Sequence, residues 1–209
     1  MIEQYAKEKG FELTGNNGFD SLLRPNIDLY YMNLCFGVNL RSLDKSSKCG
    51  CIACSEDGAF LTSGYNSPLR GSDDKNIPHT RPEKYDYMEH SERNAIYNAA
   101  RHGTQIIGST FYITGFPCIP CLRGMCQSGA KKIVYGPMQA AMLKDDIFDR
   151  YADILKGQEV IINRFKYDKG LYFLNPMAKF IVDLKTKQGI KDINFEYEYC
   201  AFYSFYSLE

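Results

Sequence analysis

The chain has 209 residues, and its 25 Lys and Arg residues balance its 25 Asp and Glu residues, so its formal net charge is zero. This balance excludes the globally basic surface that is typical of nucleic-acid-binding proteins. No apolar run approaches the roughly 18–20 residues of a membrane span, and the N-terminal stretch lacks the apolar core of a signal peptide. We therefore expect a soluble, cytoplasmic protein in which the eight cysteines are thiols or metal ligands.

The predicted elements begin after an N-terminal extension of residues 1–27, which contains a turn rich in Gly and Asn. Residues 27–40 have the apolar spacing of a helix. Residues 49–66 are expected to form a hairpin, because Asp57 and Gly58 make a favoured turn pair in which the glycine supplies a positive φ angle.

A long polar loop is expected over residues 67–89, and loops of this length in compact domains are usually functional or disordered. The signals that follow it are a helix over 90–103, a strand over 110–114, a helix over 118–129 and a strand over 131–136. This order predicts an α/β sandwich. The weaker signals after residue 136 are a helix over 138–155, a strand over 159–165 and an aromatic strand over 195–207.

The sequence FPCIPC, from Phe116 to Cys121, places two cysteines at the start of a predicted helix. Cys118 and Cys121 are three residues apart and face the same side. The positive end of the helix dipole favours thiolate over thiol at this position. The pair alone is equally consistent with a metal half-site, a thiol–disulfide exchange motif and two buried thiols.

An upstream motif favours the metal interpretation. His90 and Glu92 form H-x-E at the start of the preceding helix, and H-x-E followed by P-C-x-x-C is the signature of zinc deaminases. One histidine and two cysteines supply three zinc ligands and leave the fourth tetrahedral position to water. Glu92 is then the group that carries protons between the water, the base and the leaving ammonia.

The pattern extends well beyond the two motifs. From about Tyr30 to Gly136 the pieces LRSLDKSSKCGC, GYNSPLRGSDD, HSERNAIYNAARHG, TFYITGFPCIPC and QSGAKKIVYG follow in order. In these residues the chain resembles the deoxycytidylate (dCMP) deaminases of the cytidine and deoxycytidylate deaminase superfamily, in particular the phage and eukaryotic kind. The resemblance implies a three-layer α/β/α sandwich with a central mixed sheet. The catalytic domain would be residues 28–139, with extensions over 1–27 and 140–209, the second packing on this domain or at a subunit interface.

The resemblance also implies the reaction. Relatives hydrolyse dCMP to dUMP and ammonia, a step in the supply of dTMP. In this chain it implies a catalytic Zn²⁺ on His90, Cys118 and Cys121, with Glu92 as the acid and base.

The substrate contacts are implied in the same way. Asn66 in GYN matches an asparagine that contacts the sugar in relatives. Arg41 and Ser42 match a segment near the substrate phosphate. The backbone N–H of Ser91 is placed to meet the base carbonyl, and Pro117 completes the expected substrate-binding set.

The chain also departs from the family pattern. Ser91 stands where relatives usually have Ala, and Ser67 stands where they commonly have a second Gly in the loop of the regulatory nucleotide site. Asp73 and Asp74 are candidates to hold Mg²⁺ beside a regulatory nucleotide, and a solvated acidic loop is an equal alternative. Relatives are often hexamers, and Arg101 matches an arginine near subunit contacts, so we expect a homo-oligomer.

Three cysteines lie outside the zinc motif. Cys49, Cys51 and Cys54 form C-x-C-x-x-C, and some phage relatives carry a second, structural zinc. In a strand, however, residues 49 and 51 share one face and residue 54 takes the other. We therefore expect small buried thiols here.

Competing functions remain open at this point. Deamination of a base in nucleic acid uses the same zinc chemistry, but the zero net charge and the deoxycytidylate-type loop disfavour it. A 5-substituted dCMP or dCTP is an alternative substrate that the residues do not exclude. A structural relic with a closed zinc site would have no use for Glu92.

Overall fold

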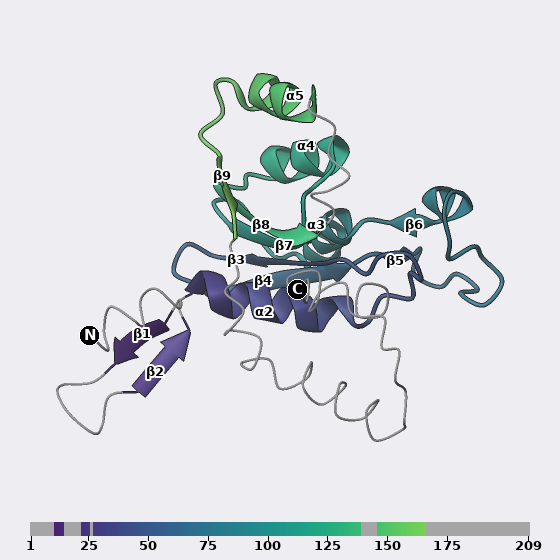
Figure 1. Cartoon of the computed structure of the whole chain (residues 1–209), viewed down its shortest axis with the longest axis horizontal. Helices are drawn as coiled ribbons and strands as arrows, with labels where there is room; N and C mark the ends of the chain where they lie inside the picture. Colours follow the sequence, from purple (N-terminus) through teal and green to yellow (C-terminus); the bar gives the residue numbers. More distant parts are fainter. Residues whose placement is uncertain (1–10, 15–21, 26, 139–145, 166–209) are drawn as a thin grey trace, which may run out of the picture.

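The central feature of the fold is a five-stranded mixed sheet with strand order β4-β3-β7-β8-β9 (Figure 1). The computed structural model describes residues 11–14, 22–25, 27–138 and 146–165. The strands of this sheet are β3 (Gly50–Cys54), β4 (Phe60–Tyr65), β7 (Thr110–Gly115), β8 (Lys132–Met138) and β9 (Ile161–Arg164). The helices are α2 (Ile27–Asn39), α3 (Ser91–His102), α4 (Ile119–Gln127) and α5 (Asp146–Leu155). The smaller elements are β1 (Phe11–Thr14), β2 (Leu22–Pro25), β5 (Ser67–Pro68), the 3₁₀ turn η1 (Glu83–Asp86) and β6 (Met88–Glu89).

The directions of the strands explain where helices α4 and α5 lie along the chain. Strand β3 is antiparallel to both β4 and β7, whereas β7, β8 and β9 run parallel. Parallel neighbours need a crossover connection, and α4 and α5 lie in the two crossovers. The cysteine motif therefore comes directly after the carboxyl end of β7, where the chain turns into α4.

Helices cover both faces of the sheet (Figure 1). Helix α2 packs on one face against β3 and β7, and α3 and α4 lie on the other. Under α2, the ring of Tyr31 stacks on Tyr112 with centroids 5.2 Å apart. On the other face, Phe111 and Leu122 belong to one buried apolar cluster. All five residues of β3 are buried, as expected for a central strand that is covered on both sides. The expected three-layer α/β/α sandwich is confirmed.

Most predicted elements of the central region are confirmed. The helix expected over 27–40 spans Ile27–Asn39, and the 49–66 hairpin forms around Gly58, whose φ angle is +85°. Residues 67–89 are mainly loop but include β5, η1 and β6. None of the described helices has the length and apolar character needed to cross a membrane.

The extensions differ from the expectation in one respect. Residues 1–27 were expected to precede the folded elements, yet β1 and β2 pair there as an antiparallel hairpin. Each strand has only four residues, which is too short for a reliable period-two pattern. In the C-terminal extension, α5 and β9 are present and β9 pairs with β8. The first part of the helix expected over 138–155 and the strand expected over 195–207 lie outside the described residues.

A close backbone approach fixes α3 on β4. A Cβ atom at Gly64 would lie 2.3 Å from the carbonyl oxygen of Ser91 and 2.4 Å from the backbone nitrogen of Ala95. Gly64→Ala must therefore push away the first turn of α3. We expect it to lower the free energy of unfolding by about 1–3 kcal/mol, measured by chemical denaturation.

Gly37 offers a matched control, because an added Cβ there meets nothing within 4 Å. Gly37→Ala lies inside α2 and is expected to be neutral or to stabilise the protein by up to about 1 kcal/mol. Equal stability of the Gly64→Ala and Gly37→Ala proteins would show that the α3–β4 approach is not tight.

Candidate metal centre and substrate cavity

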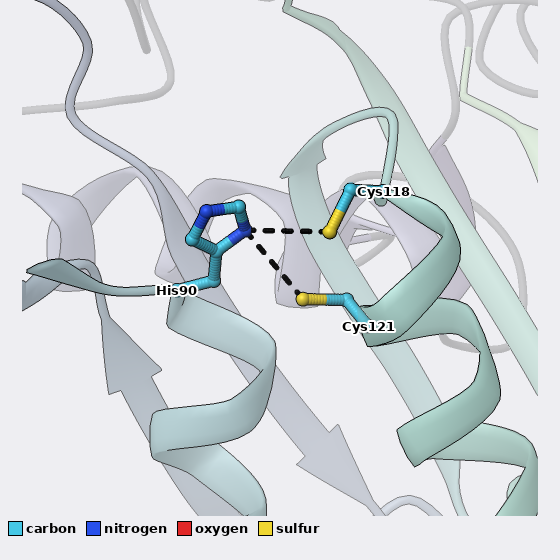
Figure 2. Close-up of side chains that lie close together, drawn as sticks. All are labelled: His90, Cys118 and Cys121. Carbon is cyan, nitrogen blue, oxygen red and sulfur yellow. Dashed lines mark hydrogen bonds between the residues drawn. The ribbon is translucent and has the colours of Figure 1, made fainter. Parts of the chain in front are cut away.

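The side chains of His90, Cys118 and Cys121 converge on one point (Figure 2). The Nδ1 atom of His90 lies 3.5 Å from the Sγ atom of Cys118 and 3.6 Å from that of Cys121. All three ligand atoms lie within 4.8 Å of one another. Within residues 11–14, 22–25, 27–138 and 146–165, this is the one group of His, Cys, Asp or Glu side chains close enough to hold a metal.

Two helix N-termini bring these side chains together. His90 is the N-cap of α3, and Cys118 is the N-cap of α4. Cys121 lies in the first turn of α4, where Pro120 fits because the first backbone N–H groups of a helix have no partner within the helix. The two helices contact each other, so their positive dipole ends lie near the thiols and favour thiolates there.

The three ligand atoms fit a zinc ion. Tetrahedral zinc with Zn–S of ~2.3 Å and Zn–N of ~2.0 Å requires N···S separations of ~3.5 Å, which the His90 distances match. Imidazole and thiolate are also the ligand types that zinc prefers. These residues would supply three of the four ligands of a tetrahedral zinc ion and leave the fourth to water.

The pKa values within the group reflect their mutual contacts. The hydrogen bond with Cys121 lowers the pKa of the Cys118 thiol, and the contact with His90 lowers it further. The same contact with Cys118, together with burial, raises the pKa of Cys121. The hydrogen bond with Cys118 raises the pKa of His90. Within the group, Cys118 is therefore the cysteine whose thiolate form is favoured.

A cavity of about 310 Å³ adjoins the metal centre. Its lining residues come from the metal centre and from four other segments: Asp44, Ser47, Cys49, Asn66, Arg81, Lys84, Tyr85, Met88, His90, Ser91, Glu92, Ile113, Gly115, Phe116, Pro117 and Cys118. The volume suits a small molecule of roughly nucleotide size.

Glu92 is the acidic residue of the cavity beside the metal centre. It is only 5% exposed, and burial raises the pKa of its carboxyl group. The hydroxyl of Ser91 donates a hydrogen bond of 2.8 Å to Glu92 Oε2. A buried carboxylate with a raised pKa, held in one orientation, is suited to taking up and releasing a proton.

Helix α5 supports the loop that carries the cysteines. The hydroxyl of Tyr151 donates a hydrogen bond to the carbonyl oxygen of Pro117. The ring of Phe116 packs against Tyr151 and Tyr135, with centroids 4.7 and 4.9 Å away. Helix α5 therefore packs against the loop that leads from β7 to Cys118.

The structure brings most of the sequence-predicted residues to this site. Asn66, Ser91, Glu92 and Pro117 line the cavity with two of the metal-centre residues, and Cys121 lies buried in the same centre.

Arg41 and Ser42, which are expected near the substrate phosphate, do not line the cavity. Ser42 is 1% exposed, and its hydroxyl donates to the carbonyl oxygen of Asn66 and accepts from the backbone N–H of Asp44. Its hydrogen-bonding capacity is used within the protein. Arg41 is exposed and does not line the cavity.

The two acidic loop residues lie apart from the metal centre. Asp73 and Asp74 are exposed, and Asp73 accepts hydrogen bonds from the backbone N–H of Lys75 and the side chain of Asn76. In the described part of the chain they belong to no cluster of potential metal ligands.

The cysteines of C-x-C-x-x-C also form no metal cluster among the described residues. Cys51 and Cys54 are buried, and burial raises the pKa of both thiols. Cys51 belongs to the apolar cluster under α3 and α4. The expectation of small buried thiols is confirmed for Cys51 and Cys54, whereas Cys49 is half-buried and lines the cavity.

The sequence patterns did not indicate several residues that line the cavity, namely Asp44, Ser47, Arg81, Lys84, Tyr85 and Phe116. Lys84 stands in a polar loop and has the pattern of a solvated lysine, yet it is 3% exposed. The one sequence feature that could have indicated this part of the cavity is the position of Asp44 inside the family-like segment LRSLDKSSKCGC.

Comparisons with known proteins agree with this geometry. The family model of the cytidine and deoxycytidylate deaminase zinc-binding region matches residues 25–137, which is more than half of the chain. Human deoxycytidylate deaminase is 30% identical over 112 residues, which cover 51% of this chain and 62% of the human protein. Deoxycytidylate deaminase of Enterobacteria phage T4 is 52% identical over 46 residues, which cover 22% of this chain and 24% of the phage protein. The match thus spans less than two thirds of the length of these curated relatives.

Solved structures show the same similarity. The apo crystal structure of dCMP deaminase from the cyanophage S-TIM5 is 27% identical with a TM-score of 0.53, over 68% of this chain and 99% of that chain. The crystal structure of the same protein in complex with dCMP and dUMP is 25% identical with a TM-score of 0.51, over 69% and 100% of the two chains. On the family match, the shared fold and the His-Cys-Cys centre, the chain belongs to the cytidine and deoxycytidylate deaminase family.

Proposed function

We propose that this protein is a zinc-dependent deaminase that hydrolyses dCMP to dUMP and ammonia. The observation that carries the proposal is the open three-ligand centre of His90, Cys118 and Cys121 beside the buried Glu92 in one cavity. We take dCMP as the substrate because the human, phage T4 and cyanophage relatives are named deoxycytidylate or dCMP deaminases. The cyanophage structure in complex with dCMP and dUMP supports this choice.

The roles of the residues follow from their positions. Bound zinc would lower the pKa of a water molecule toward neutrality and so supply a hydroxide nucleophile. Glu92 takes a proton at one carboxylate oxygen while Ser91 holds the other at 2.8 Å. It delivers this proton to the ring nitrogen, then takes a second proton from the hydroxyl that has been added to the base and passes it to the departing amine, which leaves as ammonia. Glu92 suits this role as the acidic side chain of the cavity beside the centre.

The substrate is positioned by the rest of the cavity. The backbone N–H of Ser91 is proposed to meet the base carbonyl, with Pro117 beside it. Asn66 is proposed to contact the sugar. Arg41 and Ser42 stay proposed as residues near the substrate phosphate, and neither of them lines the cavity.

Further features of the family stay proposals for this chain. Residues 28–139 would form the catalytic domain and the chain would assemble as a homo-oligomer, with relatives suggesting a hexamer. Asp73 and Asp74 would hold Mg²⁺ beside a regulatory nucleotide, and their exposure leaves them accessible to one. The cytoplasmic location also stays a prediction.

The direct test follows ammonia release and loss of cytosine absorbance with purified, zinc-analysed protein and dCMP. We expect turnover in the presence of about one zinc per chain. Parallel reactions contain deoxycytidine, dCTP, a 5-substituted dCMP and a cytosine-containing oligonucleotide, and we expect dCMP to have the highest kcat/KM. A second set with dCTP added to dCMP tests regulation. Zinc-loaded protein that leaves dCMP untouched but deaminates another of these substrates would refute the proposed substrate.

A further inference from the structure

Three basic side chains of the described residues line the cavity, namely Arg81, Lys84 and His90. His90 belongs to the metal centre. Lys84 is 3% exposed, and its Nζ atom donates to Asp44 Oδ2. A buried charge needs such a partner, so the charge of Lys84 is balanced within the protein. Arg81 is therefore the cation that both lines the cavity and is exposed to solvent.

The carboxylate of Asp44 does not oppose an anionic ligand in this cavity. Its Oδ1 atom accepts the backbone N–H groups of Ser46 and Ser47 at 2.7 and 2.9 Å. Its Oδ2 atom accepts from Lys84 and, at 2.8 Å, from Asn66 Nδ2. A carboxylate has about four acceptor sites, so this one is saturated, and its charge is compensated by the buried lysine.

The backbone on both sides of Arg81 is attached to the rest of the protein. The carbonyl oxygen of His79 accepts the backbone N–H of Lys45 at 3.3 Å, and the carbonyl oxygen of Thr80 accepts the backbone N–H of Lys84 at 3.0 Å. The buried ion pair of Lys84 fixes the same loop to the segment before β3. Arg81 lies between these attachments, so its backbone is held at the cavity although it stands in a long loop.

The exposure of Arg81 places it at the opening of the cavity. Glu92, in contrast, is buried beside the metal centre. A cytosine base that reaches Glu92 and the metal centre must enter the buried part of the cavity. The other end of the nucleotide then lies toward the opening, and in dCMP this end is the 5′-phosphate.

We propose that Arg81 is a specificity-determining residue that binds the 5′-phosphate of the substrate and thereby selects the nucleotide over the nucleoside. This proposal rests on the proposed function. A guanidinium suits a phosphate because its planar fork of N–H groups can donate two parallel hydrogen bonds. A phosphate held at the opening also stays partly hydrated, which avoids the cost of burying a dianion.

This assignment differs from the one that the family resemblance implies. Arg41 is exposed but does not line the cavity. The hydroxyl of Ser42 is already bonded to the backbone of Asn66 and Asp44. Of the two arginines, Arg81 is the one that shares the cavity with Glu92 and the metal centre.

The test compares kcat/KM for dCMP and for deoxycytidine in wild type, Arg81→Met, Arg81→Lys and Arg41→Met. We expect Arg81→Met to reduce kcat/KM for dCMP by about 10- to 100-fold, as for the loss of a hydrogen bond between charged groups. The reduction should arise mainly through KM, because the phosphate is bound equally in the ground state and the transition state. Turnover of deoxycytidine, which has no phosphate, should change by less than about threefold. Arg81→Lys keeps the charge without the fork and should lose less than Arg81→Met.

Arg70→Met is the matched control. Arg70 lies in the same loop, is exposed and does not line the cavity, so its replacement removes the same charge from the same segment. We expect it to change kcat/KM for either substrate by less than about threefold. A selective loss of dCMP turnover in Arg41→Met with none in Arg81→Met would overturn the proposal.

Calorimetry supplies a readout that needs no turnover. We expect wild type to bind dUMP at least about tenfold more tightly than deoxyuridine, and Arg81→Met to reduce this ratio below about threefold. Equal binding of the two ligands by wild type, or an unchanged ratio in Arg81→Met, would refute the role of Arg81. If wild type deaminates no cytosine nucleotide, the proposed function fails, and the dUMP comparison still decides whether Arg81 binds the phosphate.

Discussion

Replacing Glu92 by glutamine is expected to reduce kcat for dCMP by about 100- to 10,000-fold, the usual contribution of a general acid and base. Glutamine has nearly the same shape and can still accept the 2.8 Å hydrogen bond from Ser91, but it cannot take up a proton. The metal centre does not include Glu92, so the variant should retain about one zinc per chain. Binding of dUMP, measured by calorimetry, should change little.

Glu56→Gln is the control for the loss of a carboxylate. Glu56 is exposed in the turn between β3 and β4, and we expect its substitution to change kcat by less than about twofold. A Glu92→Gln protein that keeps full zinc and full turnover would contradict the proposed proton transfer. A protein that loses zinc as well would instead show that Glu92 supports the metal centre.

The metal centre was predictable because each half of it is a local pattern. His90 stands at the start of one helix, and Cys118 and Cys121 stand at the start of another. The spacing of three residues places the two cysteines on the same side of their helix. The alternation of helix and strand signals then places both helix starts in one domain. The sequence could therefore predict the ligands together with the sandwich around them.

The buried ion pair of Asp44 and Lys84, in contrast, could not be predicted from the sequence. Asp44 and Lys84 are 40 residues apart, and no periodicity or turn chemistry relates them. The motif match pointed to Arg41 and Ser42 in the segment before β3, whereas the residues of that segment that line the cavity are Asp44, Ser47 and Cys49. Which side of an irregular segment faces a cavity depends on tertiary contacts, and these have no sequence period. The β1–β2 hairpin was missed for a related reason, because four-residue strands give too little pattern.

Replacing Cys121 by alanine is expected to abolish both zinc binding and turnover. Cys121 is 0% exposed and lies within the three-ligand group, so its loss leaves only two protein ligands, too few for a tight zinc site. We expect zinc, measured by elemental analysis after dialysis, to fall from about one per chain to below a tenth. Turnover of dCMP should fall by at least the ~100-fold expected for loss of the proton carrier alone.

Thermal stability provides a second measure of zinc binding through Cys121. A metal that binds only the folded state stabilises it by ~2.7 kcal/mol at a free concentration 100 times the Kd, which corresponds to a Tm increase of about 5–10 °C for a chain of this size. Chelation should therefore lower the Tm of wild type by this amount and leave the Tm of Cys121→Ala unchanged. Cys126→Ala, which removes a half-buried thiol from the same helix but outside the group, should respond to chelation like wild type. The Cys121→Ala protein could instead keep one tightly bound zinc and the same response to chelation as wild type. Cys121 would then not be a ligand, because the folded state would gain the same binding energy without the Cys121 thiolate.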